Sequence, residues 1–146
     1  MNMDKTIKVI KDINPNTLIM IKIGSFYHTY GKDAYLLAYL FNYQLKSSEN
    51  TYNTCGFPIS AACKVTKCLE DNKISYMQIN KSENYEVENE VSFKSENQYF
   101  EMYERAYKYI SKRNRINAIY TYLKDNIEAE SIRFKLRDIE EILYES

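Results

Sequence analysis

Phe26 and His28 are the residues whose types and spacing most directly suggest binding chemistry in this sequence. They flank Tyr27 at the end of an apolar run that predicts a strand. Successive side chains of a strand point to opposite faces, so Phe26 and His28 share one face and Tyr27 lies on the other. A flat apolar ring and a hydrogen-bonding group are therefore expected side by side. A plainer interpretation, which also stays open, places Phe26 and Tyr30 in the core and His28 at the surface.

A second candidate binding feature is a basic run over residues 105–115, which holds five basic residues and no acid. Four of these residues fall on one face of a helix, and we call them the basic stripe: Arg105, Lys108, Lys112 and Arg115. Such a stripe can follow a phosphate backbone, and the neighbouring Tyr107 and Tyr109 can stack on unpaired bases. The alternative is a charged helix face that contacts only solvent.

The sequence shows no pattern typical of a metal, cofactor or catalytic site. Cys55, Cys63, Cys68 and His28 would make four zinc ligands, but the cysteines are separated by seven and four residues rather than by the short paired spacing of structural zinc sites. Buried or half-buried thiols are the favoured interpretation. No G-x-x-x-x-G-K-[ST] phosphate loop occurs, and only three glycines are present. We expect a protein that is not an enzyme and needs no cofactor or metal.

Composition limits the partners and the location. Twenty basic and twenty acidic residues cancel, so binding to nucleic acid would depend on local charge. A hydrophobic fraction of 45% predicts a folded chain, and 146 residues suit one domain or one domain with an appendage. Three cysteines cannot all pair within one chain, and no apolar run is long enough to cross a membrane. A cytoplasmic protein with no membrane partner is expected.

Helical and strand patterns alternate over the first half of the chain. The predicted elements are helices over 4–13, 34–44 and 61–71 and strands over 17–23 and 74–79. Asp33 and Ser60 are suitable helix N-caps, and the Cys-Gly-Phe-Pro run at residues 55–58 predicts a tight turn. This order predicts an α/β or α+β fold, with helices packed on a small mixed sheet.

The second half of the chain is predicted to be mostly helical. Residues 80–95 are polar with partial alternation, which fits either an edge hairpin or a linker. From residue 96 onward, three apolar stripes predict either three helices or two helices with a long first one. The first stripe consists of Phe100, Tyr103, Tyr107 and Ile110. We therefore predict an α/β unit over residues 1–93 and a helical unit for oligomerisation or backbone binding over residues 96–146.

Two motifs with their spacing carry a family resemblance. The run IKIGSFYHTYGKDA is preceded by NPNTLIM and followed at residue 55 by CGFP. This arrangement resembles the N-terminal, mismatch-recognising domain of the MutS family of DNA repair proteins, over residues 5–80. That family has an arginine-methionine-glycine-aspartate-phenylalanine-tyrosine-glutamate run before a helix and then a cysteine-glycine-valine-proline motif.

The resemblance implies roles for individual residues. In the family, the phenylalanine wedges against a mispaired base from the minor groove and the glutamate hydrogen-bonds that base. By position Phe26 is the wedge, while His28 replaces the glutamate and Ser25 replaces the aspartate. Lys22 and Lys32 flank the motif as expected phosphate contacts. With these departures, nonspecific duplex binding or a loss of DNA binding altogether fits as well as mismatch reading.

The leading expectation is a stand-alone, non-catalytic nucleic-acid-binding protein that lacks the repair ATPase. DNA is the expected partner, with RNA as the alternative, and the basic stripe would hold the backbone. The competing expectation is a scaffold that forms a homo-oligomer or binds a protein partner through the C-terminal helices. Such a scaffold would include an accessory subunit of a mobile-element or repair enzyme that no longer reads mismatches.

Overall fold

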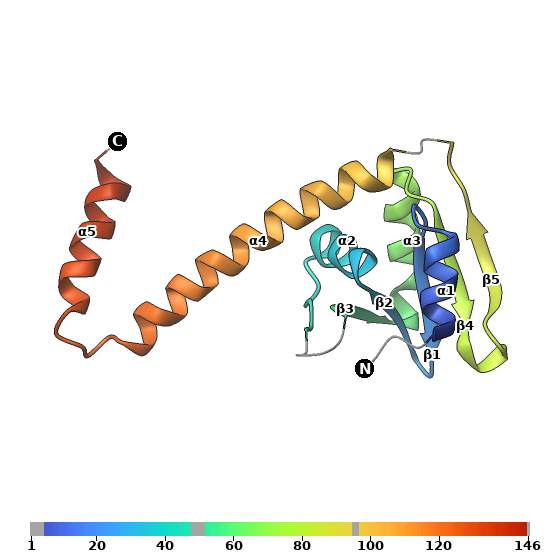
Figure 1. Cartoon of the computed structure of the whole chain (residues 1–146), viewed down its shortest axis with the longest axis horizontal. Coiled ribbons are helices and arrows are strands. Elements are labelled where there is room, and N and C mark those ends of the chain that lie inside the picture. Colours follow the sequence, from blue (N-terminus) through green and yellow to red (C-terminus); the bar gives the residue numbers. More distant parts are fainter. Residues whose placement is uncertain (1–4, 48–51, 95–96, 146) are drawn as a thin grey trace. The chain divides into compact units, whose positions relative to one another are not determined.

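A computed structural model of the chain describes residues 5–47, 52–94 and 97–145 (Figure 1). The chain forms two compact units that divide between Ile110 and Ser111. The first contains every strand of the described residues, and the second is helical. We refer to them as the sheet unit and the helical unit.

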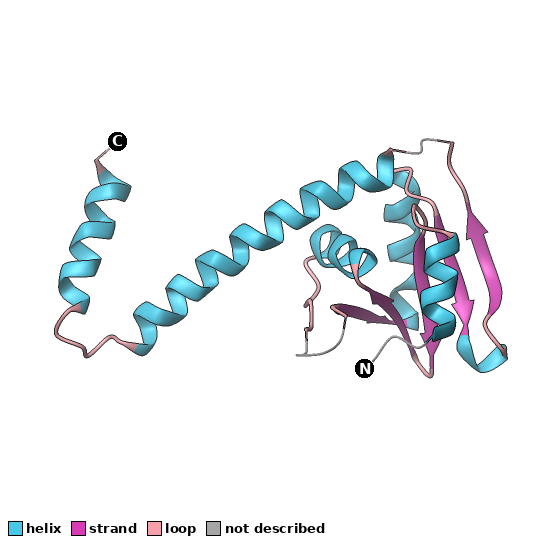
Figure 2. Ribbon diagram, viewed as in Figure 1, coloured by secondary structure: helices cyan, strands magenta, loops and turns pink. Residues whose placement is uncertain are grey.

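The sheet unit is built on a mixed sheet, which confirms the α+β class expected from the sequence (Figure 2). Its strands are β1 (Leu18–Ile23), β2 (Phe26–Tyr30), β3 (Thr54–Pro58), β4 (Tyr76–Asn80) and β5 (Glu86–Val91). The strand order is β3-β2-β1-β4-β5, with β1 and β4 parallel and the other neighbours antiparallel. The region after residue 80 is therefore an edge hairpin rather than a linker, and a short 3-10 turn, η2 (Lys81–Glu83), connects β4 to β5.

The prediction of a tight turn at residues 55–58 was wrong, because these residues form most of strand β3. Gly56 pairs with His28 across the β2–β3 ladder, and Cys55 and Phe57 alternate into the core. Pro58 ends the strand at the edge of the sheet, where its missing N–H costs no hydrogen bond. Gly56 and Pro58 favour a turn locally, but pairing with β2 and burial of Cys55 and Phe57 make the segment a strand.

Helices cover the two faces of the sheet unequally. The helices of the sheet unit are α1 (Lys5–Ile13), α2 (Lys32–Phe41), α3 (Ala62–Asp71) and the beginning of α4 (Gln98–Asp125). One face packs against α2, α3 and α4 through a core that includes Met20, Tyr27 and Phe57. The opposite face packs against α1 through a smaller core around Ile7 and Ile21.

Part of the α1 face stays open. The core beneath α1 draws its side chains mainly from β1 and β4. On the same face, the part made by the first half of β2 and by β3 carries Phe26, His28, Gly56 and Pro58, and none of these four is buried. We call these four residues the open half of the sheet.

Asp33 does not cap α2, contrary to the sequence prediction. It lies in the first turn, is only 2% exposed, and its carboxylate accepts three hydrogen bonds. The donors are the Ile19 amide at 3.1 Å, the Lys11 ammonium at 2.8 Å and the Tyr99 hydroxyl at 2.5 Å. Burial raises the pKa of Asp33 above its ordinary value, and these three donors oppose that rise. This buried carboxylate ties β1, α1 and α4 to α2.

The predicted Ser60 cap is also absent. Ser60 lies in a 3-10 turn, η1 (Ile59–Ala61), and α3 begins after Ala61 without a side-chain cap. The inward face of α3 agrees with the sequence, because Val65 and Leu69 are fully buried.

The C-terminal region contains α4 and α5 (Ile132–Tyr144), which matches the prediction of two helices with a long first one. The apolar face of α4 differs from the predicted stripe. Its buried residues are Tyr99, Met102, Ala106 and Ile110, whereas Phe100 and Tyr107 are exposed. The start of α4 packs into the core of the sheet unit, so the division between units lies within α4 rather than at residues 93–96.

Among the described helices, even the 28-residue α4 lacks the long apolar run that crossing a bilayer requires.

Candidate nucleic-acid interface

Phe26 stands exposed at the tip of the β1–β2 hairpin. The turn contains Gly24 with φ of 63°, and Phe26 pairs with Ile23 directly after it. Glycine at the first central position is typical of a two-residue hairpin turn, because this backbone conformation strains other residues. The Phe26 side chain is 46% exposed, although a phenylalanine in a strand usually faces a core. The structure therefore excludes a core position for Phe26, while Tyr30, at 5% exposure, is a core residue.

His28 lies on the same face as Phe26, as the alternation predicted. It is partly buried and pairs with Gly56, which lacks the side chain that would crowd the imidazole. A Cβ at Gly56 would lie 3.6 Å from His28 Nδ1 and 3.2 Å from the Tyr27 carbonyl oxygen. Burial, followed by the charge of Lys46, lowers the pKa of His28 below its ordinary value. The lowered pKa favours the neutral ring, in which one nitrogen donates and the other accepts hydrogen bonds.

A hollow of about 490 Å³ lies beside Phe26 and His28 and is lined by edge strand β3. Strand β3 and the segment after α2 complete its lining, with Tyr43, Gln44 and Lys46 from that segment. Lys46 is exposed and pairs with Thr54 through two backbone hydrogen bonds of 2.8 Å. The hollow thus combines an exposed ring, a neutral imidazole and one nearby cation.

Tyr43 and Lys46 were not among the residues singled out from the sequence. They follow α2 in a stretch without regular pattern, and only the bridge between Lys46 and Thr54 brings them beside β3. The Asn42 backbone, with φ of 55°, ends α2 in the left-handed conformation and redirects the chain. An asparagine after an apolar helix was the one available signal for this change of direction.

Lys22 and Lys32 lie away from this hollow. Lys22 pairs with Tyr27 in the β1–β2 ladder, so it lies on the face opposite Phe26 and His28. There its ammonium forms a 2.7 Å ion pair with Glu88. Lys32 begins α2 and places its ammonium 5.3 Å from the centre of the Tyr103 ring. The structure therefore does not bring these lysines together with Phe26 and His28.

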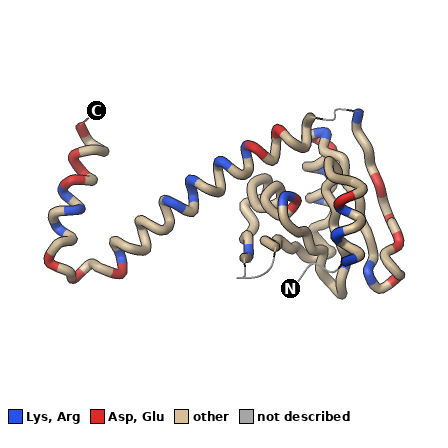
Figure 3. Tube along the Cα trace, viewed as in Figure 1, with Lys and Arg blue, Asp and Glu red and all other residues tan. Residues whose placement is uncertain are grey.

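The four residues of the basic stripe are exposed. Figure 3 shows Lys and Arg recurring along α4. Arg105 and Lys108 belong to the sheet unit, and Lys112 and Arg115 belong to the helical unit. No ion pair given for the described residues engages any of the four. The stripe runs along one continuous helix, as its spacing predicted.

The three cysteines are free thiols in different surroundings. Cys55 is buried in β3, where burial raises its pKa to about 12, while Cys63 is exposed and Cys68 half-buried on α3. Within residues 5–47, 52–94 and 97–145, no three His, Cys, Asp or Glu side chains converge as a metal site would need.

Comparison with known proteins agrees with the geometry. The family model described as MutS domain I matches residues 2–92, which is more than half of the chain. The match covers the five strands, α1, α2 and α3, and it includes the hairpin that presents Phe26 and His28. A search of curated proteins gave no match. The chain belongs to the MutS domain I family.

Proposed function

We propose that this chain binds nucleic acid through the open half of the sheet, in a role that uses neither catalysis nor an ATPase within these residues. DNA is the expected partner because the MutS domain I is a DNA-binding domain. The observation that carries the proposal is the exposure of Phe26 on the same face as His28, at the tip of a hairpin. An exposed ring at the tip of the hairpin adds little to the packing of the core, but it is well placed to insert between bases.

The proposed contact combines a wedge with a hydrogen bond. Inserting an apolar ring costs a few kcal/mol of unstacking, and this cost is lowest where base pairing is already weak. The neutral imidazole of His28 can donate as well as accept, whereas an ionised glutamate only accepts. We therefore expect a preference for weakly paired or unpaired positions, with a different choice of mispair from members that carry glutamate. Lys46 supplies a phosphate contact beside the hollow.

The basic stripe supplies the second part of the proposal. Arg105 and Lys108 are exposed on the part of α4 that belongs to the sheet unit. Each phosphate that such a residue neutralises releases counterions, so it adds affinity that falls as salt rises. Contacts of this kind fix the register of the protein on the strand without reading sequence.

A binding titration tests the wedge. Fluorescence anisotropy would be measured at low salt with a matched duplex, the same duplex carrying one mismatch, and single-stranded DNA and RNA of equal length. We expect wild type to favour the mismatched or single-stranded DNA, and Phe26→Ala to abolish that preference. Phe100→Ala is the matched control, because Phe100 is also an exposed phenylalanine of the sheet unit, at 54% exposure. A preference that survives Phe26→Ala would refute the wedge, and no binding by wild type would refute the function.

The salt dependence of affinity tests the basic stripe. The variant Arg105→Glu/Lys108→Glu should reduce the slope of log K against log salt on duplex DNA by roughly 2, at about 0.9 per phosphate contact. Lys67→Glu/Lys73→Glu makes the same change of charge around α3 and should leave the slope near that of wild type. Equal slopes for the two variants would remove the stripe from the interface.

A second candidate function is assembly through the helical unit. Several large apolar side chains of this unit are exposed, which is typical of interaction surfaces. They include Ile116, Ile119, Ile127, Ile142 and Leu143. Sedimentation equilibrium over a wide concentration range tests this proposal, because an oligomer would gain mass with concentration and a strict monomer would contradict self-assembly.

The proposed setting is the cytoplasm. The exposed free thiol of Cys63 would stay reduced there, which is the usual state of cysteines in that compartment. Localisation of the tagged chain tests this part independently of binding.

A further inference from the structure

A second cavity lies in the sheet unit, lined by residues of α1 and of the start of α2. It has a volume of about 600 Å³, within the range typical of small-molecule sites. Lysines and tyrosines dominate its lining: Lys8, Lys11 and Lys32 with Tyr30, Tyr35, Tyr52 and Tyr103. We call it the lysine-tyrosine pocket. None of its described lining residues also lines the hollow beside Phe26.

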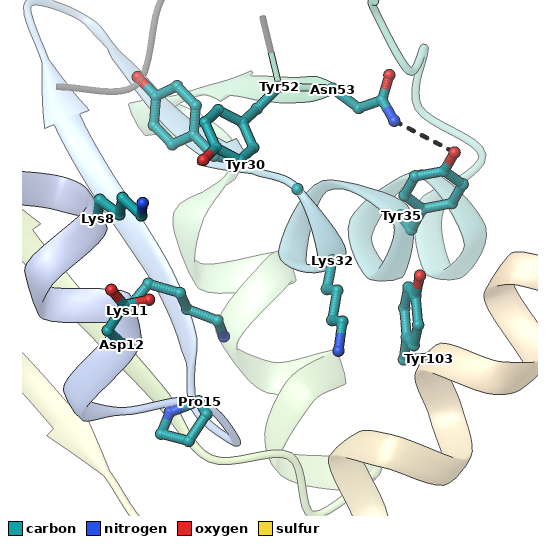
Figure 4. Close-up of a pocket in the computed structure, with 11 residues that line it drawn as sticks. Lys8, Lys11, Asp12, Pro15, Tyr30, Lys32, Tyr35, Tyr52, Asn53 and Tyr103 are labelled. Carbon is teal, nitrogen blue, oxygen red and sulfur yellow. Dashed lines mark hydrogen bonds between the residues drawn. The ribbon is translucent and has the colours of Figure 1, made fainter. Parts of the chain in front are cut away.

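The charge of the pocket favours an anion. Three lysines line it against one acid, Asp12. The Lys11 ammonium is committed to buried Asp33 and to the Thr17 carbonyl oxygen, at 2.8 and 2.7 Å. Lys8 and Lys32 are exposed, and no ion pair of the described residues engages either one. Figure 4 shows Lys11 and Lys32 extending from α1 and α2 toward the space between these helices.

The beginning of α2 adds to this preference. Gly31 and Lys32 line the pocket, and Gly31 precedes the helix with φ of 59°, without a side-chain cap for the helix. The first amides of a helix have no intrahelical partners and carry the positive end of its dipole. Asp33 directs its carboxylate to Ile19, Lys11 and Tyr99 instead of to these amides. The helix start therefore lines the same cavity as two lysines for which the described residues show no ion pair, and together they suit a phosphate.

The aromatic lining favours a flat ring on the same ligand. Tyr35 and Tyr103 pack edge to face with ring centres 6.1 Å apart, and the Asn53 amide donates to the Tyr35 hydroxyl at 3.2 Å. These rings are thus held in place. Tyr52 is 46% exposed. Its ring lies beside Gly31, because a Cβ placed on Gly31 would be 3.9 Å from the ring. The half-exposed Tyr52 ring can stack on a base, an interaction worth about 1–3 kcal/mol per base in single-strand binding proteins.

We propose that the lysine-tyrosine pocket binds a nucleotide, with the phosphate on Lys8, Lys32 and the start of α2 and the base against Tyr52. The nucleotide is either free or the phosphorylated end of a strand. An inorganic anion would use the lysines but not the tyrosines, and an uncharged aromatic molecule would leave the positive charge unused. This site is additional to the proposed binding of nucleic acid by Phe26.

The proposal is tested by two-dimensional amide NMR on the full chain, because nucleotide absorption would obscure tyrosine fluorescence. The probes are thymidine 5′-monophosphate, adenosine 5′-monophosphate, thymidine, inorganic phosphate and a 5′-phosphorylated thymidine hexamer. We expect the nucleotides to shift the amides of Gly31, Tyr52 and Asn53, and to bind more tightly than thymidine or phosphate. Binding of the hexamer at these amides, displaced by mononucleotide, identifies a strand end, whereas binding of mononucleotide alone identifies a free nucleotide.

Matched variants complete the test. Lys8→Gln/Lys32→Gln should weaken nucleotide binding about tenfold, the loss expected from two solvent-exposed charge contacts, and Tyr52→Ala should remove the advantage of nucleotide over phosphate. Lys67→Gln on α3 should have no effect. The proposal is overturned if no nucleotide shifts these amides at millimolar concentration, if phosphate binds as tightly as nucleotide, or if the lysine variant binds as wild type does. Phe26→Ala should leave pocket binding unchanged, so this site and the Phe26 interface can fail separately.

Discussion

The hydrogen bond between Tyr99 and Asp33 yields the most demanding stability prediction. The Tyr99 hydroxyl donates to the Asp33 carboxylate at 2.5 Å, and both side chains are buried. These residues lie far apart in the sequence, so their contact exists only in the folded chain. The perturbations are Tyr99→Phe, Asp33→Ala and the double variant, which form a double-mutant cycle.

The expected magnitudes follow from the partners that each variant loses. Tyr99→Phe removes one hydrogen bond to a charged group, which costs about 1.5–3 kcal/mol. Asp33→Ala leaves the Ile19 amide and the Tyr99 hydroxyl without their buried acceptor, at about 1–3 kcal/mol each. Removing the buried charge offsets part of this, so we expect a net loss of about 2–5 kcal/mol. Because the variants share a contact, the coupling energy should be about 1.5–3 kcal/mol.

Urea unfolding followed by far-UV circular dichroism measures these energies. A loss of about 2 kcal/mol shifts the midpoint by roughly 1 M at a slope of about 2 kcal/mol/M. Tyr120→Phe is the matched control, because Tyr120 lies in the helical unit and is 61% exposed. It should change the free energy of unfolding by less than about 0.5 kcal/mol. Protection of the Ile19 amide from hydrogen exchange gives a second, local measurement, which should fall in Asp33→Ala.

The pH dependence of stability gives an independent test of the role of Asp33. The folded pKa of Asp33 is raised, so the folded state keeps a proton that the unfolded state has already released. The contribution of Asp33 to the free energy of unfolding therefore falls as pH rises from the ordinary aspartate pKa through the raised one. This slope should be absent in Asp33→Ala. A coupling energy below about 0.5 kcal/mol, or a slope that Asp33→Ala leaves unchanged, would refute the role assigned to this carboxylate.

Three further predictions concern the hairpin, His28 and the thiols. Gly24→Ala should destabilise the sheet unit by about 1–2 kcal/mol in urea unfolding, because Gly24 has φ of 63°. No atom of the described residues lies near the position of the added Cβ, so the cost comes from the backbone conformation alone. An unchanged free energy of unfolding would mean that the turn adapts to alanine. Because the pKa of His28 is lowered in the folded state, the unfolded chain takes up a proton first, and stability should fall as pH drops below the ordinary histidine pKa. His28→Asn should flatten this dependence of stability on pH. An NMR titration that gives His28 an ordinary or raised pKa would contradict the prediction. A thiol reagent at mildly alkaline pH should label exposed Cys63 rapidly. Buried Cys55, with its pKa of about 12, should react only on unfolding. Mass spectrometry of the peptides measures both reactions, and early labelling of Cys55 would contradict the prediction.

The sequence predicted the elements wherever local pattern and burial agree. Alternation in Phe26-Tyr27-His28 was sufficient to place Phe26 and His28 on one face and Tyr27 on the other, although not to say which face is buried. The helical spacing of Val65 and Leu69 gave the inward face of α3, and the break at Asn14-Pro15 gave the end of α1. These features follow from the geometry of one strand or one helix, so no distant contact is needed to infer them.

The failures occurred where a distant segment overrides a local preference. Gly56 and Pro58 favour a turn, yet pairing with β2 makes their segment a strand. Asp33 is well suited to cap a helix, yet donors from β1, α1 and α4 draw its carboxylate into the core. Lys22 stands near Phe26 in the sequence, but the β1–β2 hairpin pairs Lys22 with Tyr27 and Ile23 with Phe26, so Lys22 and Phe26 lie on opposite faces. A tertiary hydrogen bond or a buried contact outweighs propensities of only a few tenths of a kcal/mol.

The sequence by itself determined the fold class, the MutS domain I family and the face that Phe26 and His28 share. It also determined the basic stripe, because charge spacing on a helix needs no partner. Only the tertiary structure decided that Phe26 is exposed, since this depends on α1 covering β1 and β4 but leaving β3 and the first half of β2 open. It likewise assembled the lysine-tyrosine pocket from α1, α2, α4 and the segment before β3. Cavities arise where separate elements fail to fill the space between them, and no pattern within one element records that.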